Sequence, residues 1–195
     1  MRASGVTRII CLCVLIAGLS ACADDIVPPD QKTFDEGAAA FDAGDYKTAF
    51  GIFRSLADNG DIAAERNVAL MERKGLGTDK DPEAAMSDYK DAANKGLPTA
   101  QSDLAEMYLN GEAGAPDPAA ALPWLERAVA ASHPIAQYHL GQLYEAGMVV
   151  PKDLHKAELL YAAAAAHGVK EAVERLSALK SWPAPGEPEP APPSP

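Results

Sequence analysis

The sequence predicts an all-α protein, a right-handed α-solenoid built from antiparallel helical hairpins. The first observation is a pattern of small and apolar residues that recurs every 36 residues. The second is composition, since 48% of the 195 residues are hydrophobic but only 6% are aromatic. The difference is largely alanine, which favours helices and close contacts between them. A repeat of this length is typical of units that bury their apolar faces only against their neighbours.

Each of three successive units is expected to contain two helices. Ala136, Leu140 and Tyr144 show the pattern of the first helix, because a spacing of i, i+4 and i+8 places them on one face. The second helix carries a similar row. We number these three units two, three and four, because a shorter hairpin is expected before them. Their equivalent positions are Ala64, Ala100 and Ala136; Val68, Leu104 and Leu140; Ala85, Ala121 and Ala157; Tyr89, Leu125 and Tyr161; and Ala92, Ala128 and Ala164.

The ends of these helices are marked by residues with strong positional preferences. A glycine follows the first helix of each unit, where a left-handed C-cap is expected. An aspartate precedes the second helix as an N-cap, and in two units a proline follows it. These residues are Gly75, Gly111 and Gly147, and then Asp81, Asp117 and Asp153. Pro123 lies inside a predicted helix and is expected to kink it.

A shorter hairpin is expected before these units, and a single helix after them. The spacing of the first hairpin resembles that of a tetratricopeptide repeat. The residues that carry this resemblance are Gly37, Gly44, Ala49, Phe53 and Leu56. After the last unit, Leu176 continues the apolar row of Leu140. We therefore expect a helix there that caps the exposed end of the solenoid.

The full pattern resembles the Sel-one-like repeat (SLR) family, a close relative of the tetratricopeptide repeat (TPR). Unit four carries it most completely, through Leu140, Gly141, Tyr144, Gly147, Asp153, Lys156, Ala157 and Tyr161. Unit two departs from it, because Val68 and Glu72 replace a leucine and a tyrosine. The resemblance implies a solenoid that binds other proteins. Some family members have a disulfide in each repeat, but this chain lacks the cysteines to form them.

The first residues resemble the export signal of a bacterial lipoprotein. Arg2 and Arg8 precede an apolar run over residues 9–19. That run is shorter than the roughly 20 residues of a transmembrane helix and is typical of a secretory signal. It ends in Leu-Ser-Ala-Cys22, which is similar to a lipobox. The resemblance implies cleavage before Cys22 and a lipid on its sulfur, which would anchor the chain to a membrane. Ala23 favours the outer membrane, facing the periplasm.

The predicted organisation has four parts. Residues 1–21 are a lipoprotein signal peptide, 22–30 a flexible tether, 31–180 the repeat domain and 181–195 a disordered proline-rich tail. The units of the repeat domain cover about residues 31–63, 64–99, 100–135 and 136–171, followed by a cap over 172–180. A second interpretation of the tail, as a docking peptide for an aromatic groove, stays open.

Charge and residue spacing argue against several classes of function. The net charge of −11 disfavours nucleic acid as a partner. We find no metal-spaced cluster, no glycine-rich phosphate loop and no convincing catalytic triad. The four histidines, His133, His139, His155 and His167, are scattered around unit four. We therefore expect no metal, no cofactor and no enzymatic activity.

Partner binding is expected on the concave face, which the first helix of each unit lines. The geometry of tetratricopeptide repeats suggests three residues per unit: Arg66, Leu70 and Arg73; Ser102, Glu106 and Asn110; and Tyr138, Gln142 and Glu145. Such a face would be basic at one end and acidic or polar at the other. This pattern suits a peptide groove, and it suits a solvated helix surface equally.

The leading hypothesis is a lipid-anchored periplasmic adaptor, a non-catalytic scaffold that binds a protein or peptide partner in this groove. On this hypothesis, charge reversal at Arg66, Arg73 or Glu145 should abolish binding without changing the thermal melt. One alternative is an envelope hydrolase, because some cysteine-rich relatives are associated with β-lactams or cell-wall material. Another is a structural lipoprotein that binds the cell wall.

Overall fold

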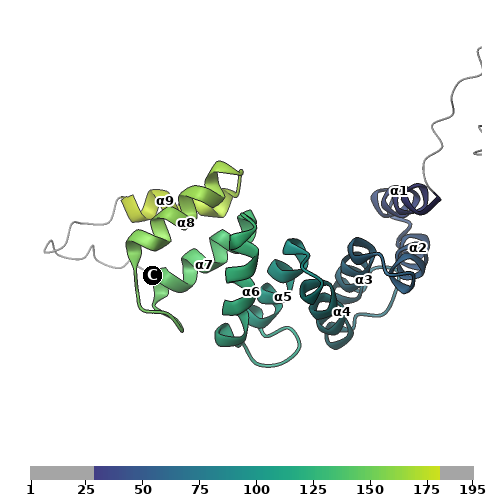
Figure 1. The fold of residues 1–195 in the computed structure, drawn as a ribbon, viewed down its shortest axis with the longest axis horizontal. Coiled ribbons are helices and arrows are strands. Elements are labelled where there is room, and N and C mark those ends of the chain that lie inside the picture. Colours follow the sequence, from purple (N-terminus) through teal and green to yellow (C-terminus); the bar gives the residue numbers. More distant parts are fainter. Residues whose placement is uncertain (1–28, 181–195) are drawn as a thin grey trace, which may run out of the picture.

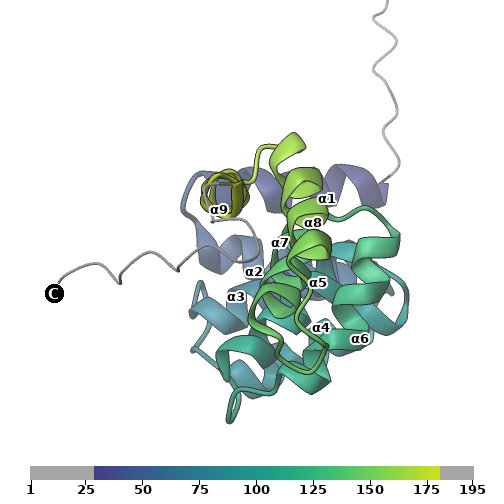
Figure 2. The ribbon, with the colours of Figure 1, turned by 90° about the vertical axis from the view of Figure 1, so that its left-hand side faces the viewer.

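The computed structural model describes residues 29–180, which fold into nine helices arranged as a curved row (Figure 1). The helices are α1 (Pro29–Asp42), α2 (Tyr46–Asp58), α3 (Ile62–Lys74), α4 (Pro82–Asn94), α5 (Pro98–Asn110), α6 (Pro118–Ala130), α7 (Pro134–Ala146), α8 (Leu154–Ala166) and α9 (Lys170–Lys180). Each helix packs against the next one along the chain, and α5 also contacts α7. Seen along the row, the hairpins lie one behind another (Figure 2). The predicted all-α solenoid is confirmed.

The helix ends form as the capping residues predict. Units two, three and four consist of α3–α4, α5–α6 and α7–α8, and a left-handed glycine follows the first helix of each, with φ of 70°, 67° and 70°. In each unit an aspartate Oδ1 accepts a hydrogen bond from the third following backbone amide, at 3.0, 2.9 and 2.9 Å. These bonds satisfy amides that the helix itself leaves free.

The core consists of the predicted repeated rows. Ala64, Ala100 and Ala136 are completely buried, as are Tyr89 and Tyr161 on the second helices. The small residues allow the helices of each hairpin to approach closely, and the larger ones fill the space between neighbouring hairpins. Because each apolar face is covered by the next unit, no unit has a separate core of its own.

Two helix starts differ from the sequence predictions. The helix α1 begins at Pro29, inside the predicted tether, because proline is well tolerated in a first turn. The capping helix α9 begins at Lys170 rather than 172. The helix α6 runs without interruption through Pro123. Its buried residues Ala121, Leu125 and Ala128 hold it against its neighbours although one backbone hydrogen bond is lost.

Several predictions concern residues outside the described range. The signal peptide, Cys22, most of the tether and the tail over residues 181–195 all lie there. Between residues 29 and 180, no helix combines the length and apolarity needed to cross a membrane.

An ion cluster joins the first hairpin to unit two. Arg54 on α2 donates hydrogen bonds to Glu72 on α3 and to Asp88 on α4, the latter at 3.4 Å. Glu72 is 6% exposed, and its Oε2 atom has no hydrogen-bond partner. This residue takes the place of Tyr108 and Tyr144 in the later units. The departure from the family pattern at Glu72 therefore serves the contact with a different preceding hairpin.

Candidate functional site: the inner groove

A continuous groove follows the odd-numbered helices. It consists of neighbouring hollows that share residues: Arg66 lines three of them, and Tyr138 and His139 each line two. We define the inner groove by Arg66, Leu70, Arg73, Asp103, Glu106, Leu109, Asn110, Glu112, Tyr138, His139, Gln142, Leu143, Glu145, Met148 and Arg175. It therefore runs from α3 across α5 and α7 to α9, with polar and apolar stretches.

Eight of the nine residues predicted for the concave face line this groove. Ser102 does not, because it is only 1% exposed and its Oγ atom is buried without a hydrogen-bond partner. The prediction for Ser102 is therefore wrong. Its equivalents Arg66 and Tyr138 have long side chains that reach the groove, whereas a serine is short enough to be covered by its neighbours.

The predicted basic end of the groove is neutralised by ion pairs between units. Arg66 Nε donates to Asp103 Oδ2 at 2.7 Å. Arg73 donates to Glu106 Oε1 at 2.9 Å and also binds Glu112. These hydrogen bonds, first those to Glu112, raise the pKa of Arg73, and its guanidinium lowers the pKa of Glu112. The arginines therefore connect helices, and reversing their charge would disturb the fold as well as any binding. The predicted unchanged melt does not follow from this structure.

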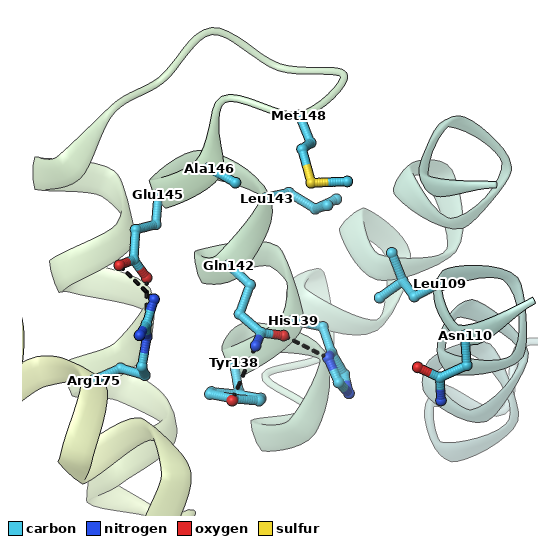
Figure 3. A pocket seen from close by; sticks show the side chains of 10 residues that line it. All are labelled: Leu109, Asn110, Tyr138, His139, Gln142, Leu143, Glu145, Ala146, Met148 and Arg175. Atoms are coloured by element: carbon cyan, nitrogen blue, oxygen red, sulfur yellow. Dashed lines mark hydrogen bonds and ion pairs between the residues drawn. The ribbon is translucent and has the colours of Figure 1, made fainter. Parts of the chain in front are cut away.

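The groove in unit four is built from hydrogen-bonded polar groups and one ion pair (Figure 3). Gln142 Nε2 donates to Tyr138 Oη at 3.0 Å, and Gln142 Oε1 lies 3.0 Å from His139 Nδ1. Glu145 accepts from Arg175 of α9 at 2.6 Å and from Tyr161 Oη at 2.6 Å. Burial, together with this bond to Glu145, raises the pKa of Tyr161. These contacts fix the side chains in place before any partner binds.

The spacing of charged residues in the sequence indicates these ion pairs. A prediction made one position at a time from the geometry of tetratricopeptide repeats does not use that spacing. Arg66 and Asp103 are separated by 37 positions, and Arg73 is separated from Glu106 and Glu112 by 33 and 39. These separations are close to the repeat length of 36. Opposite charges about one period apart therefore lie on neighbouring first helices, where they can pair.

The inner groove offers no arrangement of metal ligands. Within residues 29–180, no group of three or more His, Cys, Asp or Glu side chains is placed to hold a metal ion. His133 and His139 both lie at the groove, but burial lowers the pKa of His133 and its Nδ1 atom has no hydrogen-bond partner. The site is suited to recognition by shape and hydrogen bonding.

Comparison with protein families identifies the same three repeat units. The Sel1 repeat matches residues 62–97, 98–133 and 134–169. Each match contains one pair of helices and begins two residues before the corresponding predicted unit. These three matches together cover more than half of the chain. Among curated proteins, none matches this sequence significantly.

Solved structures share this architecture. A Sel1 repeat protein from Oxalobacter formigenes is 31% identical with a TM-score of 0.69, over 74% of this chain and 59% of that one. The protective antigen c5321 of uropathogenic Escherichia coli displays an SLR fold and is 25% identical, with a TM-score of 0.71. The match covers 78% of this chain and 34% of the antigen. The immunity protein Pa5087 from Pseudomonas aeruginosa shares the fold, with a TM-score of 0.57 at 24% identity. That match covers 78% of this chain and 58% of Pa5087.

This chain therefore spans only part of the length of those proteins. It covers 59% of the Oxalobacter protein and 34% of the antigen, so their functions as whole proteins do not transfer directly. What is shared is the fold of the Sel1 repeat. On this agreement between sequence, fold and comparison, the chain belongs to the Sel1 repeat family.

Proposed function

We propose that this protein is a non-catalytic scaffold that binds a partner protein along the inner groove. Sel1 repeat proteins typically act as scaffolds for protein interaction. The observation that carries the proposal for this chain is the continuity of the groove across α3, α5, α7 and α9. A long surface with both hydrogen-bonding and apolar groups suits an extended protein segment better than a small molecule.

We further propose that the scaffold works at a bacterial membrane, facing the periplasm, with a lipid on Cys22 as its anchor. The support is the lipobox-like sequence after a short apolar run. A lipid-modified cysteine followed by a short tether would keep the repeat domain close to the membrane surface. The outer membrane is favoured because Ala23, rather than an aspartate, follows the cysteine.

Photo-crosslinking in cells tests the groove directly. A photoreactive phenylalanine analogue is placed at Thr99 or Lys74, two exposed positions at the groove. Matched controls carry it at Lys90 or Glu126, which are equally exposed on α4 and α6. We expect adducts with a partner protein from the groove positions and not from the controls, as seen by capture and mass spectrometry. Adducts formed only from α4 and α6 would move the interface away from the groove.

Substitution of the lipobox cysteine tests the anchor. In the Cys22→Ser variant we expect incorporation of an alkyne-labelled fatty acid to be lost and the protein to leave the membrane fraction. The physical reason is that an acyl chain provides about 0.8 kcal/mol of membrane affinity per buried methylene. A Ser20→Ala variant, which keeps a small residue before the cysteine, serves as the control. Unchanged labelling of Cys22→Ser would remove the proposed anchor.

A further inference from the structure

One hollow of the inner groove is lined by apolar side chains. Leu109 at the end of α5, Leu143 on α7 and Met148 in the loop after α7 gather on one side of it (Figure 3). The hollow has a volume of about 570 Å3, within the range of ligand sites. Leu143 is 3% exposed and forms the floor, whereas Met148 is 46% exposed. We call these three residues the apolar slot.

The equivalent hollow one repeat earlier has a similar volume, about 550 Å3, but charged side chains line it. Shifting by 36 residues places Leu109 on Arg73 and Met148 on Glu112. Arg73 and Glu112 bind each other, and the Arg73 side chain is only 12% exposed. Unit three thus has a salt bridge where unit four has two apolar side chains with space between them. The apolar slot is a specific feature of unit four.

The corresponding loop of unit two is also covered. Leu76, the equivalent of Met148, packs against the core of the first hairpin. Gly77 lies so close to α2 that an added Cβ would be 2.1 Å from the Tyr46 carbonyl oxygen. The loop of unit two is thus covered by contacts within the chain, and Glu112 in the loop of unit three is paired with Arg73. Met148 and Val149 of unit four are exposed instead.

The backbone of the unit-four loop supports a role for its exposed side chains. Val149 has φ of +54°, in the left-handed region, where its unit-two equivalent Gly77 has φ of +72°. A β-branched side chain is unfavourable there, and Val149 is 50% exposed. Val149 therefore has neither the backbone preference of glycine nor burial within the chain. Strain of this kind persists most often at functional sites.

The groups around the apolar slot carry no uncompensated charge. Asn110 and Gln142 are uncharged amides, and the carboxylate of Glu145 is paired with Arg175. Gln142 and Asn110 each use one amide hydrogen within the chain, toward Tyr138 and Glu112, and keep the other. Two neutral amides beside an apolar floor complement a peptide backbone with an apolar side chain, and they disfavour a charged one.

We propose that the apolar slot binds one apolar side chain of an extended, locally uncharged segment of the partner protein. The amides of Asn110 and Gln142 bind the peptide groups on either side of that residue. This inference rests on the proposed scaffold function and adds the chemistry of the partner. The slot sets which segment binds, because the stretch of the groove along α3 and α5 is lined by internal ion pairs instead.

Transplanting the ion pair of unit three tests the slot. The double variant Leu109→Arg, Met148→Glu rebuilds the Arg73–Glu112 arrangement in unit four and should replace the apolar lining of the slot by an ion pair. The single variant Met148→Glu changes only an exposed side chain, so it keeps the test valid if the double variant unfolds. Circular dichroism checks that each variant keeps its helices.

The probes are blocked heptapeptides Gly-Ser-Gly-X-Gly-Ser-Gly, in which X is leucine, phenylalanine, serine, glutamate or lysine. Methyl NMR follows the signals of Leu109, Leu143 and Met148 in the natural protein. We expect saturable shifts with the leucine and phenylalanine peptides, and affinity at least tenfold lower for the other three. Both variants should lose the shifts at Leu143.

The reverse exchange is a gain-of-function control. The variant Arg73→Leu, Glu106→Gln, Glu112→Met gives unit three the groups of unit four. In this variant the leucine peptide should also shift methyl signals of unit three, such as that of Met107.

Three results would overturn the slot. The first is no saturable shift with any peptide, and the second is equal binding of charged and apolar peptides. The third is the same shifts on raising the protein concentration alone, which would mean self-association.

Failure of the slot and failure of the scaffold are distinguishable. Groove crosslinks that persist in the Met148→Glu variant, without peptide binding to the natural protein, would leave the scaffold standing. Absence of adducts from both photoreactive groove positions, with the slot residues unchanged, would remove the scaffold itself.

Discussion

Replacing Arg54 by alanine is expected to lower the free energy of unfolding by about 2 kcal/mol at neutral pH. Removal of one partner of a buried ion pair typically costs about 3–5 kcal/mol, because the other charge stays buried. The cost here is smaller because the Arg54 side chain is 40% exposed, so water can reach part of Glu72 once it is gone. Urea denaturation followed by circular dichroism measures the loss.

This loss should shrink as the pH falls. Burial raises the pKa of Glu72 above its ordinary 4.5, and burial likewise raises the pKa of Asp88, while Arg54 opposes both shifts. A carboxyl group with a raised folded pKa stabilises the protein in its protonated form. That contribution is complete below the ordinary value and is lost as the pH rises through the folded pKa. Without Arg54 both pKa values rise further, so the deficit at pH 7 should decrease toward acid pH.

A second substitution separates this mechanism from general damage. Arg54→Ala combined with Glu72→Leu removes the buried charge together with its partner, and most of the lost stability should return. Lys95→Ala breaks a pair with Glu65 in which the lysine is 44% exposed, and should cost at most about 1 kcal/mol. An equal loss in the single and double Arg54 variants would show that Glu72 is not responsible.

Gly141→Ala is expected to destabilise the protein by about 1–3 kcal/mol, the usual cost of overpacking a core. An added Cβ would lie 2.7 Å from Tyr161 Cε1, closer than real contacts allow. The ring cannot move away freely, because it is completely buried and its hydroxyl donates to Glu145. Thermal and urea unfolding should both show the loss.

A matched control uses Gly51, a helical glycine of α2 whose added Cβ would meet nothing within 4 Å. Gly51→Ala should be neutral or stabilising by about 0.5–1 kcal/mol, because alanine is the better helix former. Tyr161→Leu should relieve the Gly141→Ala variant, since unit three combines Ala105 with Leu125. A Gly141→Ala protein that melts like the natural one would show that α7 and α8 have room to separate.

The repeated features of the fold follow from the sequence because they depend on local preferences. Gly111 and Asp117 show this: a left-handed cap needs glycine, and an exposed helix start needs a side-chain acceptor. The buried row of Ala100 and Leu104 follows from helical spacing. The position of α9 within two residues and the continuity of α6 depend on packing between units, which local preferences do not specify.

The candidate site was only partly predictable, because its residues interact across units. Ser102 was placed on the groove by analogy, but its exposure depends on how its neighbours cover it. Helical spacing places Arg73 on the concave face, but it does not show that Arg73 binds Glu106 and Glu112 of the next unit. The sequence alone does not mark Met148 and Leu109 as binding residues, since isolated apolar residues are common on surfaces. Only their equivalence to an ion pair one period earlier shows that they form a slot.

The placement of the charged pairs also has a mechanical consequence. Arg66–Asp103, Arg73–Glu106 and Glu145–Arg175 each join one first helix to the next along the inner side of the arc. These pairs hold neighbouring helices together on the inner side of the row and therefore contribute to its curvature. Salt screens the pair of the 48% exposed Arg175 more than the pairs of Arg73, whose side chain is 12% exposed. We therefore expect the curvature at the α3–α5 end to persist at high ionic strength, while the contact between α7 and α9 loosens.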